Sequence, residues 1–275
     1  MSQNPLQQYF RQPKIYISLP SGGVYNEPGD FQGDTTNMAI FGMTGMDEIM
    51  LRTPDALISG ETTVKVVKSC CPSISNPWNL TTLDTNSIFA AIKIATFGNK
   101  MTIGHTCPHC SADNDYSLDL NFVVEHYAGC KYNNTLVIDE LTVRTQPLTY
   151  RKTTDFSLRT FSLQQQLKQV DAITDEKEKS EFYQKLFLEL SSVQNELYLE
   201  SVESISLSDI VVTEREYILE FLEKCDKSVF DKIKEHVDSN SDSFQLPNYP
   251  VKCSECEKES GVYIDLDQTN FFVNA

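Results

Sequence analysis

Four of the eight cysteines in this 275-residue chain form two pairs with the same spacing. The pairs are Cys107-Pro108-His109-Cys110 and Cys253-Ser254-Glu255-Cys256. Two intervening residues allow one tight turn to direct both sulfurs of a pair at a single ion. One pair alone could be redox-active or accidental, whereas two pairs supply the four thiolates of a structural zinc site. We therefore predict a zinc site with Cys107, Cys110, Cys253 and Cys256 as ligands; the alternative is four free buried thiols.

A site with four thiolate ligands has no open coordination position for water, so the predicted metal is structural and not catalytic. His105 and His109 lie beside or within the first turn and could substitute as ligands, although the complete set of thiols makes this unnecessary. The other two histidines, His126 and His236, fall on predicted helices. The sequence contains no phosphate-binding glycine loop and no nucleophile elbow. We therefore do not expect an enzyme.

Each cysteine pair lies between two segments in which apolar residues alternate, which predicts a strand, a metal-binding turn and a second strand. The alternating residues are Met101, Ile103, Tyr116, Leu118 and Leu120 around the first pair, and Val251, Val262, Ile264 and Leu266 around the second. This is the plan of a zinc ribbon. Because Cys253 follows Cys110 by 143 positions, the segment between the two hairpins would be an insertion into the ribbon.

These observations predict an α+β fold: discontinuous zinc-ribbon-like β hairpins with a large, mainly helical insertion, a helical N-terminal region and an extended N-terminal arm. Residues 1–42 are expected to form the arm, with one short strand at 14–19. Residues 43–98 would form the helical region, and 99–130 with 246–275 the zinc-ribbon-like module. Residues 131–245 would form the insertion, a short β pair at 136–139 and 141–145 followed by an acidic helical bundle from about residue 152.

Several local signals place the helices. Thr53-Pro54-Asp55 predicts a helix start, and a second helix is expected from Asp84 to Gly98. Residues 62–71 fit either a helix or a strand. A clear amphipathic helical stripe is formed by Phe182, Leu186, Leu190, Val193 and Leu197. Thr213 and Glu216 have the spacing of a capping box for the following helix, and 239–247 is predicted to be a polar loop.

The chain carries a net charge of −16, and residues 171–242 contribute 19 acidic and 8 basic residues to it. Such acidity disfavours contact with a phosphate backbone. It therefore weighs against the alternative function, a zinc-ribbon regulator that binds nucleic acid. Lys100, Lys131 and Lys252 are the cations near the cysteine pairs, and acidic residues surround them.

The chain has no apolar run of about 18 residues, so no membrane insertion is expected. Residues 1–10 lack the apolar core of a secretion signal. Paired cysteines without an export signal favour a reducing compartment. The remaining cysteines, Cys70, Cys71, Cys130 and Cys225, are interpreted as small buried apolar residues.

Aromatic pairs near the two ends are candidates for contact with a partner. Tyr9 and Phe10 lie on the predicted arm, which would either wrap its own body or lie on another protein. Phe271 and Phe272 follow the last ribbon strand, where they would either anchor a partner or fold back onto their own hairpin.

Several segments in a fixed order resemble the baseplate hub assembly proteins of T-even-type contractile-tailed bacteriophages. The similar segments lie at 8–10, 19–22, 42–48, 52–57, 144–150 and 266–272, together with both cysteine pairs. The resemblance implies a structural or assembly role in the baseplate, with other baseplate or hub proteins as partners. It also implies a location in the host cytoplasm during assembly and, for a retained component, in the tail baseplate of the virion.

Overall fold

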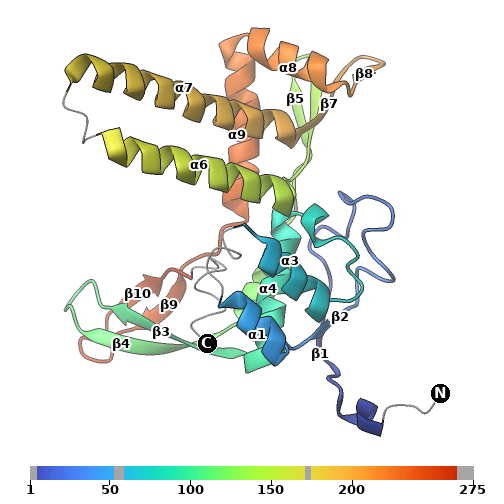
Figure 1. Cartoon of the computed structure of the whole chain (residues 1–275), viewed down its shortest axis with the longest axis vertical. Helices are drawn as coiled ribbons and strands as arrows, with labels where there is room; N and C mark the ends of the chain where they lie inside the picture. The colour runs from blue at the N-terminus through green and yellow to red at the C-terminus, as the bar shows by residue number, and fades with distance from the viewer. Residues whose placement is uncertain (1–4, 53–58, 171–174, 265–275) are drawn as a thin grey trace. The chain divides into compact units, whose positions relative to one another are not determined.

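The computed structural model describes residues 5–52, 59–170 and 175–264 (Figure 1). The chain divides into two compact units, one formed by Met1–Lys131 with Phe244–Ala275 and the other by Tyr132–Ser243. The described residues contain eight α-helices, three two-stranded hairpins and one four-stranded sheet. The predicted α+β class is therefore confirmed, including the joining of two distant hairpins by a cluster of four cysteines.

The first unit combines short helices with three antiparallel hairpins. Its elements are η1 (Pro5–Tyr9), β1 (Pro13–Ile17), β2 (Met38–Phe41), α1 (Gly45–Leu51), α3 (Glu61–Cys70), η2 (Pro77–Asn79), α4 (Thr82–Phe97), β3 (Lys100–Thr106), β4 (Asp113–Asp119), α5 (Asn121–Gly129), β9 (Tyr249–Lys252) and β10 (Glu259–Val262). The ambiguous segment at 62–71 is helical, because it forms α3. The predicted helix start at Thr53 lies outside the described residues.

Helix α4 is the core of this unit and is buried on nearly all sides. It begins at Thr82, two residues before the predicted start, because the Thr81 side chain caps it by accepting the N–H of Asp84 at 3.2 Å. Buried Asp84 in turn accepts the backbone N–H of Ser21 at 2.9 Å, which fixes the preceding turn on the helix. The helix ends at Gly98, as predicted, with a φ of 93° that suits glycine.

The first 42 residues are more structured than the single predicted strand. Strand β2 pairs antiparallel with β1, and the buried side chains of Ile17, Met38 and Ile40 join the core of the unit. A side chain at Gly42, just after β2, would place its first carbon 2.7 Å from the carbonyl oxygen of Ala95. The close approach of the backbone at position 42 to α4 therefore requires glycine. Through Ile17, Met38 and Ile40, both strands of the first 42 residues pack on their own unit.

The second unit contains a four-stranded antiparallel sheet and four helices. Its elements are β5 (Thr135–Ile138), β6 (Leu141–Thr145), α6 (Tyr150–Val170), α7 (Glu176–Ser201), β7 (Val202–Leu207), β8 (Ile210–Val212), α8 (Arg215–Lys224) and α9 (Lys227–Ser243), and the strand order is β5-β6-β7-β8. One core packs the sheet residues Val143 and Val202 against Ile218 of α8 and Ile233 of α9.

Helices α6 and α7 form an antiparallel hairpin with a second core (Figure 1). Its buried residues are Phe156, Leu163, Val170, Leu186 and Val193. The stripe predicted from residue 182 to 197 is confirmed, because Leu186 and Val193 are buried in this core and Phe182, Leu190 and Leu197 pack against it. Neighbouring helices of this kind bury an apolar stripe that neither could bury alone.

Three predictions for this unit are wrong. Strands β7 and β8 were not expected, so the sheet has four strands where a β pair was predicted. Thr213 does not cap α8, because Glu214 occupies the cap position without a side-chain capping bond and Thr213 donates its N–H to the Glu214 carboxylate. Helix α9 continues to Ser243, so the polar loop begins later than residue 239.

Candidate metal centre

Two antiparallel hairpins of the first unit carry the cysteine pairs. Strands β3 and β4 pair from Lys100 opposite Asp119 to Thr106 opposite Asp113, and their connection holds Cys107 and Cys110. Strands β9 and β10 pair in the same way around Cys253 and Cys256. Alternation of apolar residues places Leu118, Leu120, Val251, Val262 and Ile264 in the interior, as the sequence predicted. Leu266 lies outside the described residues.

The two cysteine turns have the same backbone construction. In the first, the N–H of Ser111 donates to the carbonyl of Cys107, whose own N–H donates to Ala112; both distances are 2.9 Å. In the second, the N–H of Glu257 donates to the carbonyl of Cys253 at 3.1 Å, and the N–H of Cys253 donates to Lys258 at 3.0 Å. Ser111 and Glu257 also share a left-handed φ, 59° and 57°. Each turn thus directs two sulfurs to one side.

The four sulfur atoms gather at one point, all within 4.8 Å of one another. The Sγ atoms of Cys107 and Cys256 are 3.7 Å apart, and those of Cys110 and Cys253 are 3.6 Å apart. Four sulfurs at about 2.3 Å from one tetrahedral Zn²⁺ would lie about 3.8 Å from each other. The donor set and its spacing therefore fit a zinc ion. Cys107 and Cys253 are buried, while Cys110 is exposed.

Backbone N–H groups favour negative charge at this cluster. Those of Cys256 and Glu255 lower the pKa of the Cys253 thiol to about 6. The N–H of Ala112 favours the thiolate of Cys110 too, but the sulfurs of Cys256, Cys253 and Cys107 outweigh it and raise the pKa of Cys110 to about 12. Thiolates this close repel one another, and a divalent cation between them would remove that repulsion.

Asn114 of β4 links the two cysteine turns and was not anticipated from the sequence. Its buried side-chain amide donates to the Sγ of Cys253 at 3.6 Å and to the carbonyl of Ala112 at 3.0 Å. The side-chain oxygen of Asn114 contacts Ser254 of the other turn. Partners of this kind fix the orientation of metal ligands. No spacing rule singles out this residue, because its role depends on how the two hairpins meet.

The two histidines near the first turn contact the other hairpin and not the sulfur cluster. The Nε2 atom of His109 lies 3.3 Å from the carbonyl oxygen of Glu259, and that of His105 lies 3.5 Å from the hydroxyl of Ser260. Within the described ranges, the four cysteines are the sole cluster with the composition of a metal site. The geometry thus gives neither histidine a place among the four ligand atoms.

The other predicted residues are distributed as follows. Cys70 and Cys71 are buried, and burial raises the pKa of Cys70 to about 12; Cys130 and Cys225 are only partly buried. Tyr9 and Phe10 are exposed. Phe271 and Phe272 lie outside the described residues, so their predicted contacts stay a prediction.

Comparison with known protein families gives a match over most of the chain. A family model described as "T4 bacteriophage base plate protein" matches residues 46–273. No curated protein and no solved structure gives a significant match. Among the helices that the structure describes, none combines the length and the apolar character that a membrane span requires.

Proposed function

The chain belongs to the T4 bacteriophage base plate protein family, and from this premise we propose that it is a structural or assembly protein of a contractile-tail baseplate. It acts through protein–protein contacts, without turnover, and a structural zinc stabilises it. The observation that carries the proposal is the extent of the family match, which includes both cysteine pairs and everything between them. The proposed partners are other baseplate or hub proteins.

The zinc part of the proposal is supported by the sulfur cluster. Zinc held by Cys107, Cys110, Cys253 and Cys256 would join β3–β4 to β9–β10 across the intervening chain. Structural zinc contributes about 10–16 kcal/mol of apparent binding free energy in small modules. That energy is sufficient to hold a two-stranded hairpin, which is marginally stable by itself. The ion would therefore fix the position of the second hairpin.

We also propose that the hairpins at 99–130 and 246–275 form one discontinuous module and that 131–245 is an insertion within it. The helical region would be 43–98 and the arm 1–42. Exposed Tyr9 and Phe10 on the arm, together with Phe271 and Phe272, are the proposed contact residues for partners. The protein would act in the host cytoplasm during assembly and then in the tail baseplate of the virion.

The alternative of a nucleic-acid-binding regulator has less support. Beside the cysteine turns, Asp113, Asp115, Glu255 and Glu257 provide negative charge, and Lys252 is itself paired with Glu257 at 3.4 Å. A ribbon that contacts phosphates needs a basic surface.

Two measurements test the proposed function. Elemental analysis of freshly purified protein should give one zinc per chain, and protein without a bound transition metal would contradict the zinc site. Tagged protein should recover tail proteins, identified by mass spectrometry, from phage-infected cells. The control is the same tagged protein in uninfected cells. Recovery of no tail protein would count against a role in the baseplate. A gel-shift assay with DNA and RNA tests the alternative function, which a salt-sensitive shift would favour.

A further inference from the structure

We propose that the four-cysteine cluster is also a site of oxidation, at which peroxide converts the sulfurs into two disulfides, Cys110–Cys253 and Cys107–Cys256. Both disulfides would join β3–β4 to β9–β10, so the hairpins would stay connected after the metal is released. The inference rests on the proposed function, because a component of the virion tail leaves the reducing host cytoplasm and meets an oxidising medium.

The positions of the sulfurs match the two proposed disulfides. The Sγ atoms of Cys110 and Cys253 are 3.6 Å apart, and those of Cys107 and Cys256 are 3.7 Å apart. The two pairs share no sulfur, so both bonds can form in one molecule. Because the sulfurs of a disulfide are about 2.05 Å apart, each pair must approach by roughly 1.6 Å. A shift of this size is within the reach of side-chain rotation.

Contacts outside the sulfur cluster hold the two hairpins in this arrangement. The side-chain oxygen of Asn114 on β4 contacts Ser254 of the second turn. The Nε2 atom of His109 in the first turn lies 3.3 Å from the carbonyl oxygen of Glu259 on β10. Neither contact involves a sulfur, so both persist when the cysteines are oxidised. The sulfurs of each proposed pair therefore stay close to one another while the bond forms.

A disulfide between the two cysteines of one turn is the competing product. Each turn is fixed by two backbone hydrogen bonds and by a left-handed residue, Ser111 or Glu257. Closing a ring within so short a turn would distort these bonds, whereas a bond between hairpins leaves each turn unchanged. The proposed pairs are also separated by 143 and 149 positions, so their bonds restrict the unfolded chain far more than a ring within one turn.

Each proposed pair combines an accessible sulfur with a buried one. Cys110 is exposed and Cys256 is partly exposed, whereas Cys253 and Cys107 are each only 1% exposed. Bound zinc would keep all four sulfurs deprotonated, which is the form that reacts with peroxide. Peroxide therefore meets the accessible sulfur of each pair first, and the buried sulfur completes the disulfide.

The first disulfide forms in two steps. The thiolate of Cys110 attacks one oxygen of hydrogen peroxide, which breaks the O–O bond and leaves a sulfenic acid and a hydroxide ion. The thiolate of Cys253 then attacks this sulfur, the S–O bond breaks, and a second hydroxide ion leaves. The two sulfurs lose two electrons to the peroxide, and two protons from the solvent convert the hydroxide ions into water. A second peroxide oxidises Cys256 and Cys107 in the same way.

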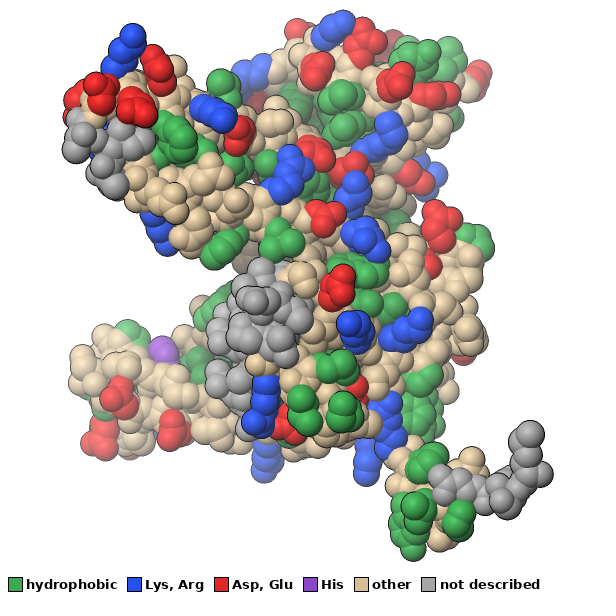
Figure 2. Space-filling view, viewed as in Figure 1, with side chains coloured by type: hydrophobic (Ala, Val, Ile, Leu, Met, Phe, Trp, Pro, Cys, Tyr) green, Lys and Arg blue, Asp and Glu red, His purple; other side chains and the backbone are tan. Residues whose placement is uncertain are grey.

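The charge around the turns favours this product over a mixed disulfide with a small thiol. Acidic residues lie beside both turns, namely Asp113, Asp115, Glu255 and Glu257, and Figure 2 shows acidic side chains on this part of the first unit. Hydrogen peroxide is uncharged and approaches without repulsion, whereas an anionic thiol such as glutathione is repelled. The sulfenic acid is therefore attacked by the neighbouring sulfur of its own cluster.

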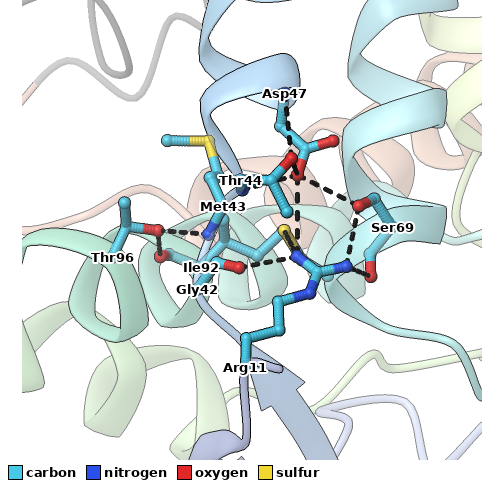
Figure 3. A network of polar contacts seen from close by, with 9 residues as sticks. Arg11, Gly42, Met43, Thr44, Asp47, Ser69, Ile92 and Thr96 are labelled. Atoms are coloured by element: carbon cyan, nitrogen blue, oxygen red, sulfur yellow. Dashed lines mark hydrogen bonds and ion pairs between the residues drawn. The ribbon is translucent and has the colours of Figure 1, made fainter. Parts of the chain in front are cut away.

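Cys70 and Cys71 are adjacent in the chain but protected from peroxide, because both are completely buried. The sulfur of Cys70 lies 3.9 Å from the guanidinium of Arg11, whose network is shown in Figure 3. This guanidinium also donates to the carbonyl of Gly42 at 2.7 Å and to that of Ser69 at 2.6 Å. Peroxide cannot reach these two cysteines in the folded protein, so they should stay reduced and provide an internal control.

The test is oxidation of the reduced, freshly purified protein with a small excess of hydrogen peroxide, followed by digestion with trypsin without reductant. Trypsin separates residues 101–131, which carry the first cysteine pair, from residues 253–258, which carry the second. Either proposed disulfide joins these two peptides, and fragmentation of the joined species identifies the bonded cysteines. The intact mass should fall by about 4 Da, and the four cysteines outside the cluster should still react with an alkylating reagent after denaturation.

A matched control is Cys130→Ser, because Cys130 lies on the same tryptic peptide as the first pair. This variant should give the same joined peptides as the wild type. The oxidised protein should also unfold at a temperature at least about 5 °C higher than the reduced, metal-free protein, and a reductant should reverse the difference.

Three results would overturn the inference: disulfides within each turn, a different pairing between the hairpins, or conversion of Cys110 to a sulfinic acid without a disulfide. The disulfide map is measured separately from the zinc content and from the recovery of tail proteins. The inference can therefore fail while the proposed function stands, and the joined peptides can be found in a protein that recovers no tail protein.

Discussion

The side-chain oxygen of Asn114 accepts two hydrogen bonds from Ser254, one from its backbone N–H at 3.1 Å and one from its hydroxyl at 2.6 Å. The two residues belong to different hairpins, so these bonds join the cysteine turns independently of any metal. Asn114→Ala would remove both of these bonds, together with the bonds that the buried Asn114 amide donates to Cys253 and Ala112. We expect it to lower the free energy of unfolding by about 1–3 kcal/mol in urea titrations of the zinc-loaded protein.

A matched variant for this experiment is Asn99→Ala on the same hairpin. Asn99 is exposed, and its amide reaches Asp119 at 3.4 Å. Its loss should change stability by less than about 0.5 kcal/mol. Equal losses of stability in the two variants would show that the bonds between the turns stabilise the fold no more than an exposed side-chain contact does.

Cys253→Ser should remove one of the proposed zinc ligands. We expect it to lose most of the bound metal and at least about 3 kcal/mol of stability. Cys225→Ser is the control, because Cys225 lies at the end of α8 in the other unit and is not part of the sulfur cluster; it should cost less than about 1 kcal/mol. Zinc content and thermal unfolding are measured for both. Similar thermal shifts would contradict the ligand assignment.

Arg11→Lys tests how firmly the N-terminal segment is fixed. An ammonium group cannot reproduce the two-pronged contact with the carbonyls of Gly42 and Ser69, although it keeps the charge near Asp47. We expect a loss of about 1–2 kcal/mol in urea unfolding. Arg52→Lys, at an exposed pair with Glu48, should be nearly neutral. If Arg11→Lys left the free energy of unfolding unchanged, one positive charge near Asp47 would be sufficient to hold the segment, without the two bonds to the carbonyls.

Lys93 of α4 gives a prediction for pH dependence. It is 2% exposed, and burial lowers its pKa from 10.5 to about 8. Below pH 8 the folded protein keeps Lys93 as a buried ammonium, which is less favourable than the solvated ammonium of the unfolded chain. Between about pH 8 and 10.5 the folded state has released the proton while the unfolded state retains it, so stability should rise with pH.

Lys93→Met should therefore raise the free energy of unfolding by about 1–3 kcal/mol at pH 7, and by less at pH 10. Lys65→Met on α3 is the control, because Lys65 is exposed and pairs only with Glu61 along its own helix. Denaturant titrations at both pH values give the comparison. If Lys93→Met raised the free energy of unfolding equally at both pH values, deprotonation of Lys93 would be excluded as the cause of the pH dependence.

The sequence predicted those features that depend on local spacing. Two residues between cysteines are visible in the chain itself, and so is the stripe from Phe182 to Leu197 that α7 buries. Strands flank each pair as predicted, and Leu118 and Val262 are buried on them, but β10 ends at Val262, so the predicted alternation at Ile264 lies beyond the strand.

Features that depend on tertiary pairing were missed. Strand β8 has three residues, too few for a periodic signal, and becomes a strand only through its pairing with β7. Thr213 had the spacing of a cap, but it follows β8 directly, and α8 begins one residue later than that spacing required. Asn114 illustrates the same limit at the metal centre, since its partner Ser254 is distant in the chain.

The separation of the two cysteine pairs has a consequence for synthesis on the ribosome. Cys253 is made 143 residues after Cys110, so the early hairpin waits with only half of its ligands while the second unit emerges and folds. A polypeptide released before residue 253 would bind the ion with two sulfurs at most. The four-sulfur site can therefore form only after Cys256 has been synthesised. Prematurely terminated products would lack the complete site and would be open to proteolysis.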